Sequence, residues 1–135
     1  MRIWKVFLSF VLVCISGAAL ADGVTPVGRY FSNVAVGAGT VVQVVAPSAN
    51  VGGLYLRTTT MYLNPSTGVV QLYANATPPA GVFDPSSRAI LAAAATTSGV
   101  GFVNLPEELY LAPGLGLYAA ANIAAWVTTS YDLQQ

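Results

Sequence analysis

Of the five acidic side chains of this sequence, the four beyond Asp22 are internal candidates for acid–base chemistry: Asp84, Glu107, Glu108 and Asp132. The chain has no histidine, and beyond residue 21 it has neither cysteine nor lysine. The commonest general base, the thiolate nucleophile and the Schiff-base amine are therefore missing together. A glycosidase needs only two carboxylates, about 5 Å apart for retention or about 6.5–9.5 Å apart for inversion. A two-carboxylate hydrolase is the one class of enzyme that this composition leaves open.

The spacing of the four carboxylates argues against such a pair. Glu107 and Glu108 are adjacent, and neighbours on a strand point to opposite faces, so a pair would need Asp84 or Asp132 to face one of them across a cleft. Asp84 begins an Asp-Pro-Ser-Ser segment that is typical of a turn, and its loop lacks the several carboxylates usual in calcium sites. We expect no catalytic residues, no cofactor and no metal site.

The first 21 residues carry the pattern of a signal peptide. Arg2 and Lys5 precede an uncharged apolar run that ends in Ala19-Leu20-Ala21, an A-x-A cleavage site. The run is shorter than the roughly 20 apolar residues of a membrane span, and no basic cluster follows it. We expect signal peptidase to recognise Ala19 and Ala21, and a mature domain, residues 22–135, to be secreted to the periplasm, the cell surface or the medium.

The mature chain is nearly free of charge. It holds three arginines against five carboxylates, so its side-chain net charge is −2, and it has no cysteine for a disulfide. Eight charged residues among 114 is far below the roughly 25% of ordinary domains. Three scattered arginines cannot neutralise a phosphate backbone, which excludes nucleic acid as a partner. Low charge and apolar patches favour self-association, so we expect a homo-oligomer.

Short β-rich runs punctuated by Gly, Pro and Asn predict eight or nine strands in one domain. The run from Leu54 to Leu63 and the run from Val69 to Ala76 are separated by five turn-forming residues, which predicts an antiparallel hairpin. Thr77 to Ser87, with three prolines, predicts the longest loop. Arg88 to Thr97 contains four consecutive alanines and is compatible with a strand or a short helix. The pattern favours an all-β sandwich, with a jelly roll as the preferred topology.

The mature chain has eleven aromatic residues, seven of which are tyrosines. Tyrosine has an apolar body and a polar tip, which suits sugar stacking, subunit interfaces and edge packing alike. Trp126 is flanked by small residues in Ala-Ala-Trp-Val-Thr-Thr, and we expect it to fill a gap in the core.

The C-terminal third resembles the closing strands of small jelly-roll structural proteins of the phage head-fibre and TNF-like kind. The residues that carry the resemblance are 109–118, Leu-Tyr-Leu-Ala-Pro-Gly-Leu-Gly-Leu-Tyr, and 124–131, Ala-Ala-Trp-Val-Thr-Thr-Ser-Tyr. The resemblance implies a trimeric structural or receptor-binding module, with no active site to carry over. The signal peptide departs from the virion pattern, because virion proteins normally assemble in the cytoplasm.

Three functions fit these observations. The leading hypothesis is a non-enzymatic secreted structural or adhesive subunit that self-associates through apolar strand faces, with a trimer favoured. The first alternative is a small carbohydrate-binding module that uses exposed tyrosines beside the Thr77 to Ser87 loop. The second is a fimbrial-type subunit that associates by strand addition.

Overall fold

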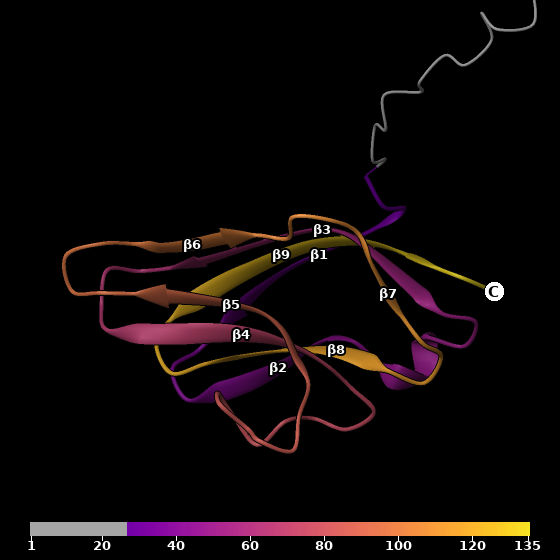
Figure 1. The fold of residues 1–135 in the computed structure, drawn as a ribbon, viewed down its shortest axis with the longest axis horizontal. Coiled ribbons are helices and arrows are strands. Elements are labelled where there is room, and N and C mark those ends of the chain that lie inside the picture. The colour runs from indigo at the N-terminus through magenta and orange to yellow at the C-terminus, as the bar shows by residue number, and fades with distance from the viewer. Residues whose placement is uncertain (1–26) are drawn as a thin grey trace, which may run out of the picture.

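Two antiparallel sheets pack face to face in the computed structural model, which describes residues 27–135 (Figure 1). The strands are β1 (Tyr30–Val36), β2 (Thr40–Val45), β3 (Leu54–Leu63), β4 (Gly68–Asn75), β5 (Ala89–Ala95), β6 (Gly101–Asn104), β7 (Leu109–Leu111), β8 (Gly116–Ala121) and β9 (Ala125–Leu133), with one 3-10 turn, η1 (Pro47–Ala49). The expected all-β sandwich is confirmed. The expected signal peptide, with Ala19 and Ala21, lies outside the described residues.

The order of the strands defines a jelly roll. One sheet runs β1-β9-β3-β6, with β7 also paired to β3, and the other runs β2-β8-β4-β5. Along the chain, β4 pairs with β5, β3 with β6 and β7, β2 with β8, and β1 with β9. The chain is therefore one long antiparallel hairpin wound into two sheets, as in jelly rolls. β6 and β7 bind opposite ends of β3 and together fill one strand position.

Alternating side chains of the strands form the core. β3 turns Leu54, Leu56, Met61 and Leu63 inward, and all four are fully buried. Because side chains alternate along a strand, Tyr55, Thr58, Thr60 and Tyr62 face outward, and the bulge at Arg57 keeps Thr59 on the inner face. The inward residues of β4, β8 and β9 complete one apolar layer between the sheets. No helix of residues 27–135 is both long and apolar enough to cross a membrane.

The predicted hairpin between the third and fourth strands is wrong. β3 and β4 lie in different sheets, and the link at residues 64–67 carries the chain across the core. Both edges of β3 are already occupied, one by β9 and the other by β6 and β7. The turn residues correctly predicted that the chain reverses direction between the two strands. β4 does not pair with β3, however, because strands from the C-terminal half already occupy both edges of β3.

The segment from Arg88 to Thr97, for which the sequence allowed either a strand or a short helix, forms a strand. β5 pairs with β4 over its whole length, from Ala95 opposite Gly68 to Ala89 opposite Tyr73. Ala93 and Ala95 face the core, whereas Ala92 and Ala94 are exposed. The hydrogen bonds of the ladder and the burial of alternate alanines outweigh the helix propensity of alanine.

Candidate functional site

Three exposed aromatic side chains form a row across the five-stranded sheet. Trp126 on β9 is the register partner of Tyr62 on β3, and Tyr62 is the register partner of Phe102 on β6. Their exposed fractions are 40%, 38% and 60%. The ring centroids of Tyr62 and Trp126 lie 5.9 Å apart with a 47° tilt. We call Trp126, Tyr62 and Phe102 the aromatic row.

The position of Trp126 contradicts its expected role in the core. Its neighbours Ala125 and Val127 are buried between the sheets, so alternation along β9 sends the indole outward. Alternation places the tryptophan and its two neighbours on opposite faces of the strand, but it does not say which face is buried. In Ala-Trp-Val-Thr-Thr, the buried alanine and valine stand two positions apart, and the tryptophan lies between them.

A row of amide and hydroxyl side chains runs beside the aromatic row. It occupies the next outward position on each strand and consists of Asn33, Thr128, Thr60 and Asn104. The Thr128 hydroxyl donates to Asn33 Oδ1 at 3.3 Å, and the Thr60 hydroxyl donates to Asn104 Oδ1 at 2.7 Å. An amide whose oxygen accepts such a bond keeps two N–H donors for another partner. We call these four residues the polar row.

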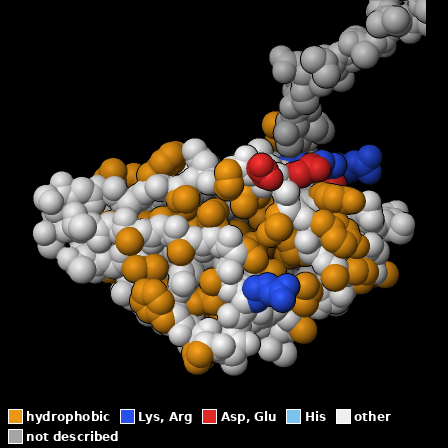
Figure 2. Space-filling model, viewed as in Figure 1, with side chains coloured by type: hydrophobic (Ala, Val, Ile, Leu, Met, Phe, Trp, Pro, Cys, Tyr) orange, Lys and Arg blue, Asp and Glu red, His pale blue; other side chains and the backbone are white. Residues whose placement is uncertain are grey.

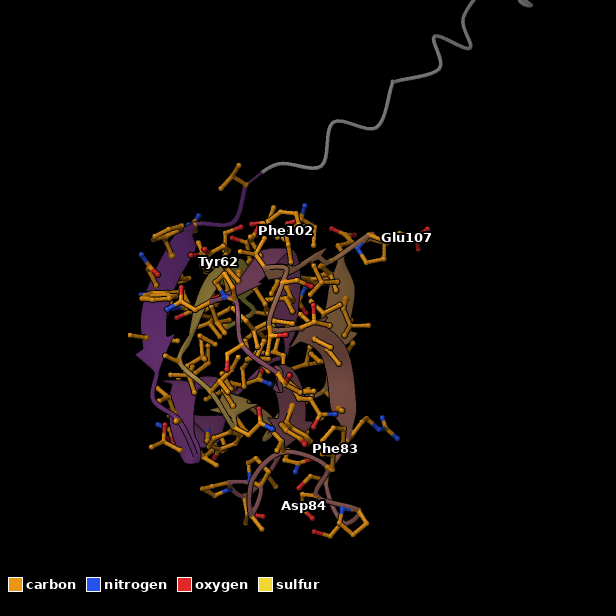
Figure 3. The ribbon with its side chains drawn as sticks, turned by 90° about the vertical axis from the view of Figure 1, so that its left-hand side faces the viewer. Tyr62, Phe83, Asp84, Phe102 and Glu107 are labelled. Carbon is orange, nitrogen blue, oxygen red and sulfur yellow. The ribbon has the colours of Figure 1, made fainter. Side chains whose placement is uncertain are left out.

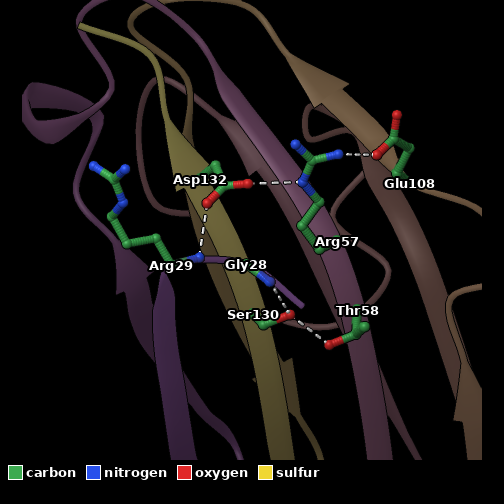
Figure 4. Close-up of polar contacts among 7 residues, drawn as sticks. All are labelled: Gly28, Arg29, Arg57, Thr58, Glu108, Ser130 and Asp132. Atoms are coloured by element: carbon green, nitrogen blue, oxygen red, sulfur yellow. Dashed lines mark hydrogen bonds and ion pairs between the residues drawn. The ribbon is translucent and has the colours of Figure 1, made fainter. Parts of the chain in front are cut away.

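A third row completes the outward face. Phe31 on β1, 68% exposed, is the register partner of Ser130 on β9, which is paired in turn with Thr58 on β3. The Ser130 and Thr58 hydroxyl oxygens lie 2.7 Å apart, and the Gly28 backbone N–H donates to Ser130 Oγ at 3.3 Å (Figure 4). The Gly28 bond fixes the chain before β1 onto β9, and the Thr58 bond joins β9 to β3.

Charged residues gather at one end of this face. The register of β3 and β9 shifts between Leu56 and Thr58, and Arg57 is the extra residue of this bulge. Its Nε donates to Asp132 Oδ2 at 2.8 Å, and its Nη1 pairs with Glu108 Oε2 (Figure 4). The Arg29 backbone N–H donates to Asp132 Oδ1 at 2.7 Å. We call Arg29, Arg57, Glu108 and Asp132 the end cluster.

The bonds of the end cluster keep Asp132 ionised. The backbone N–H of Arg29, followed by the guanidinium of Arg57, holds the pKa of Asp132 below its ordinary value. A glycosidase needs one carboxyl group with a raised pKa as its general acid. Asp132 and Glu108 do come near each other, but Arg57 bridges them. Their geometry is that of an ion-pair network.

The remaining two acidic candidates lie far apart. Figure 3 places Asp84 on a loop at one end of the molecule and Glu107 at the opposite end. Asp84 accepts hydrogen bonds from the backbone of Ala80 and from Ser86 and Ser87, and these bonds hold its pKa well below the ordinary value. The predicted Asp turn is thus confirmed. Within residues 27–135, no group of three or more His, Cys, Asp and Glu side chains is placed to hold a metal ion.

The sequence suggested exposed tyrosines beside the Thr77 to Ser87 loop, but the described structure does not place them there. That loop folds back over the outer face of its own sheet, and Val82 packs against the buried Tyr73 and Tyr118. The Tyr73 hydroxyl and the Phe83 backbone N–H both donate to Gln71 Oε1, at 2.8 and 2.6 Å. A loop that covers its sheet leaves no exposed tyrosine there, and the open aromatic face is on the other sheet.

A small pocket of about 240 Å³ lies between β5 and β7. Its walls are mostly apolar, and Arg88 is its one charged lining residue. Pockets that hold drug-sized ligands measure about 300–1,000 Å³. The pocket is therefore smaller than a typical ligand site, and the outward face of the five-stranded sheet is the stronger candidate.

The surface agrees with the low charge of the sequence. Figure 2 shows acidic and basic side chains gathered at one edge of the molecule, one further basic side chain elsewhere, and apolar or uncharged side chains over the rest of this view. A partner of this surface would meet mainly aromatic, aliphatic, amide and hydroxyl groups.

No protein-family model matches the sequence, and no curated protein matches it. Several solved structures resemble the fold, among them the two that follow. The virus-like particle protein of the extra small virus of the giant freshwater prawn Macrobrachium rosenbergii is 10% identical, with a TM-score of 0.36, over 83% of this chain and 86% of that one. A dTDP sugar isomerase from Desulfovibrio desulfuricans G20 is 14% identical, with a TM-score of 0.30, over 85% of this chain and 63% of that one. At these scores neither likeness carries an argument about function.

Proposed function

We propose that this protein is a non-enzymatic adhesive or structural subunit that binds carbohydrate through the outward face of the β1-β9-β3-β6 sheet. The observation that carries the proposal is the aromatic row lying directly beside the polar row. Sugar rings have apolar C–H faces and hydroxyl-bearing edges. Aromatic rings contact such faces, while amide and hydroxyl groups hydrogen-bond the edges.

The face has room for a short oligosaccharide. Four strands about 4.8 Å apart and seven residues about 3.3 Å apart give a projected area of roughly 400 Å². A short oligosaccharide would be covered by a face of this size.

The test is binding of the purified mature chain, residues 22–135, to an array of immobilised glycans. We expect retention on a subset of glycans, and we expect Trp126→Ala and Phe102→Ala to abolish it. Phe83→Ala is the matched control, because Phe83 is 66% exposed but lies away from Tyr62 and Phe102 (Figure 3). Loss of binding in the Phe83 variant as well, or no retention of the wild type on any glycan, would reject the proposal.

Self-association through the same face is the second candidate. The exposed rings of Phe31, Phe102 and Trp126 and the low charge favour it. Strand addition along β1, which is an edge strand among the described residues 27–135, is the fimbrial form of the same hypothesis. Light scattering during size-exclusion chromatography gives the mass in solution. If the wild type is a trimer and the Trp126→Ser, Phe102→Ser double variant is a monomer, the face serves self-association and not ligand binding.

A further inference from the structure

We infer that the ligand of this face is an uncharged, extended glycan that lies across the strands, along the aromatic row. The inference rests on the carbohydrate-binding function proposed above and adds the direction, length and charge of the ligand. Each of these three properties follows from a separate feature of the face.

The direction follows from the register of the strands. Phe102, Tyr62 and Trp126 stand on three adjacent strands, so the row runs perpendicular to β6, β3 and β9. Beyond Trp126 the row ends in Ala35 on β1, whose small side chain leaves the surface open. A chain of sugar rings can thus pass over the three aromatic rings and continue across β1.

The length follows from the spacing of the strands. β9 and β6 lie on either side of β3, and two strand spacings amount to about 10 Å. This span is longer than one sugar ring, so a single sugar cannot contact Phe102 and Trp126 together. An extended chain can place successive rings on successive aromatic side chains, whereas a coiled chain leaves the row after one or two rings.

The polar row is placed to bind one edge of such a chain. It crosses the three strands of the aromatic row and also β1, and on each strand it lies two residues, or about 7 Å, from the aromatic row or from Ala35. Rings that rest flat on the aromatic row direct their equatorial hydroxyls sideways. Asn33 and Asn104, at the two ends of the polar row, can then donate amide N–H groups to those hydroxyls.

The charge of the ligand follows from the charges of the face. The aromatic and polar rows contain no ionisable group apart from the Tyr62 phenol. The charges nearest to them are in the end cluster, with two arginines and two carboxylates, and at Glu107, a third carboxylate in the segment between β6 and β7. An acidic or sulfated glycan would lose hydration without meeting an unbalanced cation, and a neutral glycan avoids this penalty.

The mature chain reports on the site directly, because Trp126 is its single tryptophan. Residues 27–135 contain all nine strands, so chain 22–135 retains the whole sandwich. The probes are neutral cello-, manno- and xylo-oligosaccharides of one to six units, the coiled malto-oligosaccharides, and anionic oligogalacturonates of the same lengths. Binding is followed by the change in Trp126 emission and by calorimetry.

We expect affinity for at least one extended neutral series to rise about three- to tenfold with each sugar up to three or four units, because each new ring gains one aromatic contact. The malto series and the anionic series should bind at least tenfold more weakly at the same length. The Asn33→Ala, Asn104→Ala double variant should lose about tenfold or more. The matched control Gln43→Ala lies on β2 of the other sheet and should leave affinity unchanged.

The outcomes separate the two proposals. A monosaccharide that binds as tightly as a trisaccharide overturns the extended ligand, and tighter binding of the anionic series overturns the uncharged one. Both results leave carbohydrate binding in place. Absence of binding to every carbohydrate, on the array as well as in solution, overturns the proposed function together with the inference.

Discussion

Two threonines inside the sandwich offer a sharp test of the structure. Thr59 on β3 and Thr129 on β9 are register partners on the inner face, with exposed fractions of 2% and 0%. Within residues 27–135, neither hydroxyl has a hydrogen-bond partner. A buried hydroxyl without a partner costs about 1–3 kcal/mol, and valine has nearly the same shape without the hydroxyl. We therefore expect each Thr→Val replacement to raise the free energy of unfolding by about 1 kcal/mol.

The double Thr59→Val, Thr129→Val variant should be more stable by about 2 kcal/mol, provided that the two hydroxyls act independently. For a domain of this size, each 1 kcal/mol corresponds to roughly 4 °C in melting temperature. Urea unfolding and thermal melts of both single variants and of the double variant complete a double-mutant cycle, which gives the coupling energy between the two hydroxyls. Because both side chains face inward, the Trp126 emission and its response to ligand should stay as in the wild type.

Thr128→Val is the matched control. Thr128 is the outward neighbour of Thr129, it is half-buried, and its hydroxyl donates a hydrogen bond to Asn33. Its replacement should change stability by no more than about 0.5 kcal/mol. Destabilisation by Thr129→Val, or a coupling energy near 1 kcal/mol in the cycle, would refute the reasoning, because either result requires the buried hydroxyls to be hydrogen-bonded.

Three further predictions concern acid stability, the core and export. The pKa of Asp132 is lowered in the folded state, so the ionised carboxylate stabilises the fold. This contribution is complete above the unfolded pKa of about 3.9 and is lost as pH falls through the folded pKa. Thermal melts from pH 7 to pH 2 should therefore show a weaker acid dependence in Asp132→Asn than in the wild type. Leu56 is fully buried, and Leu56→Ala should cost about 2–5 kcal/mol in urea unfolding, whereas a loss below 1 kcal/mol would contradict the described packing. Mass spectrometry of the exported protein should find Asp22 at its N-terminus, and Ala21→Arg should leave the precursor uncleaved.

The candidate site could be predicted only in part. The aromatic residues and the scarcity of charge are visible in the sequence, and both describe the outward face of the five-stranded sheet correctly. The predicted location of the ligand-binding tyrosines was wrong, because the Thr77 to Ser87 loop covers its own sheet and buries Tyr73 and Tyr118. Trp126 was misplaced for a related reason. Flanking small residues say nothing about which face of a strand is buried, and that choice depends on the register with β1 and β3.

The sequence by itself determined the strands. β-branched and aromatic runs favour extended backbone through local steric preferences, and Gly, Pro and Asn end them, so the positions of eight strands follow from neighbouring residues alone. β5 is the exception, because its alanines carry no local preference for a strand. Only the tertiary structure decided which strands pair. It separated β3 from β4 and aligned Phe102, Tyr62 and Trp126 in one row. Pairing depends on burying one face of every strand at once, and this condition joins residues as far apart in the chain as Ala35 and Trp126.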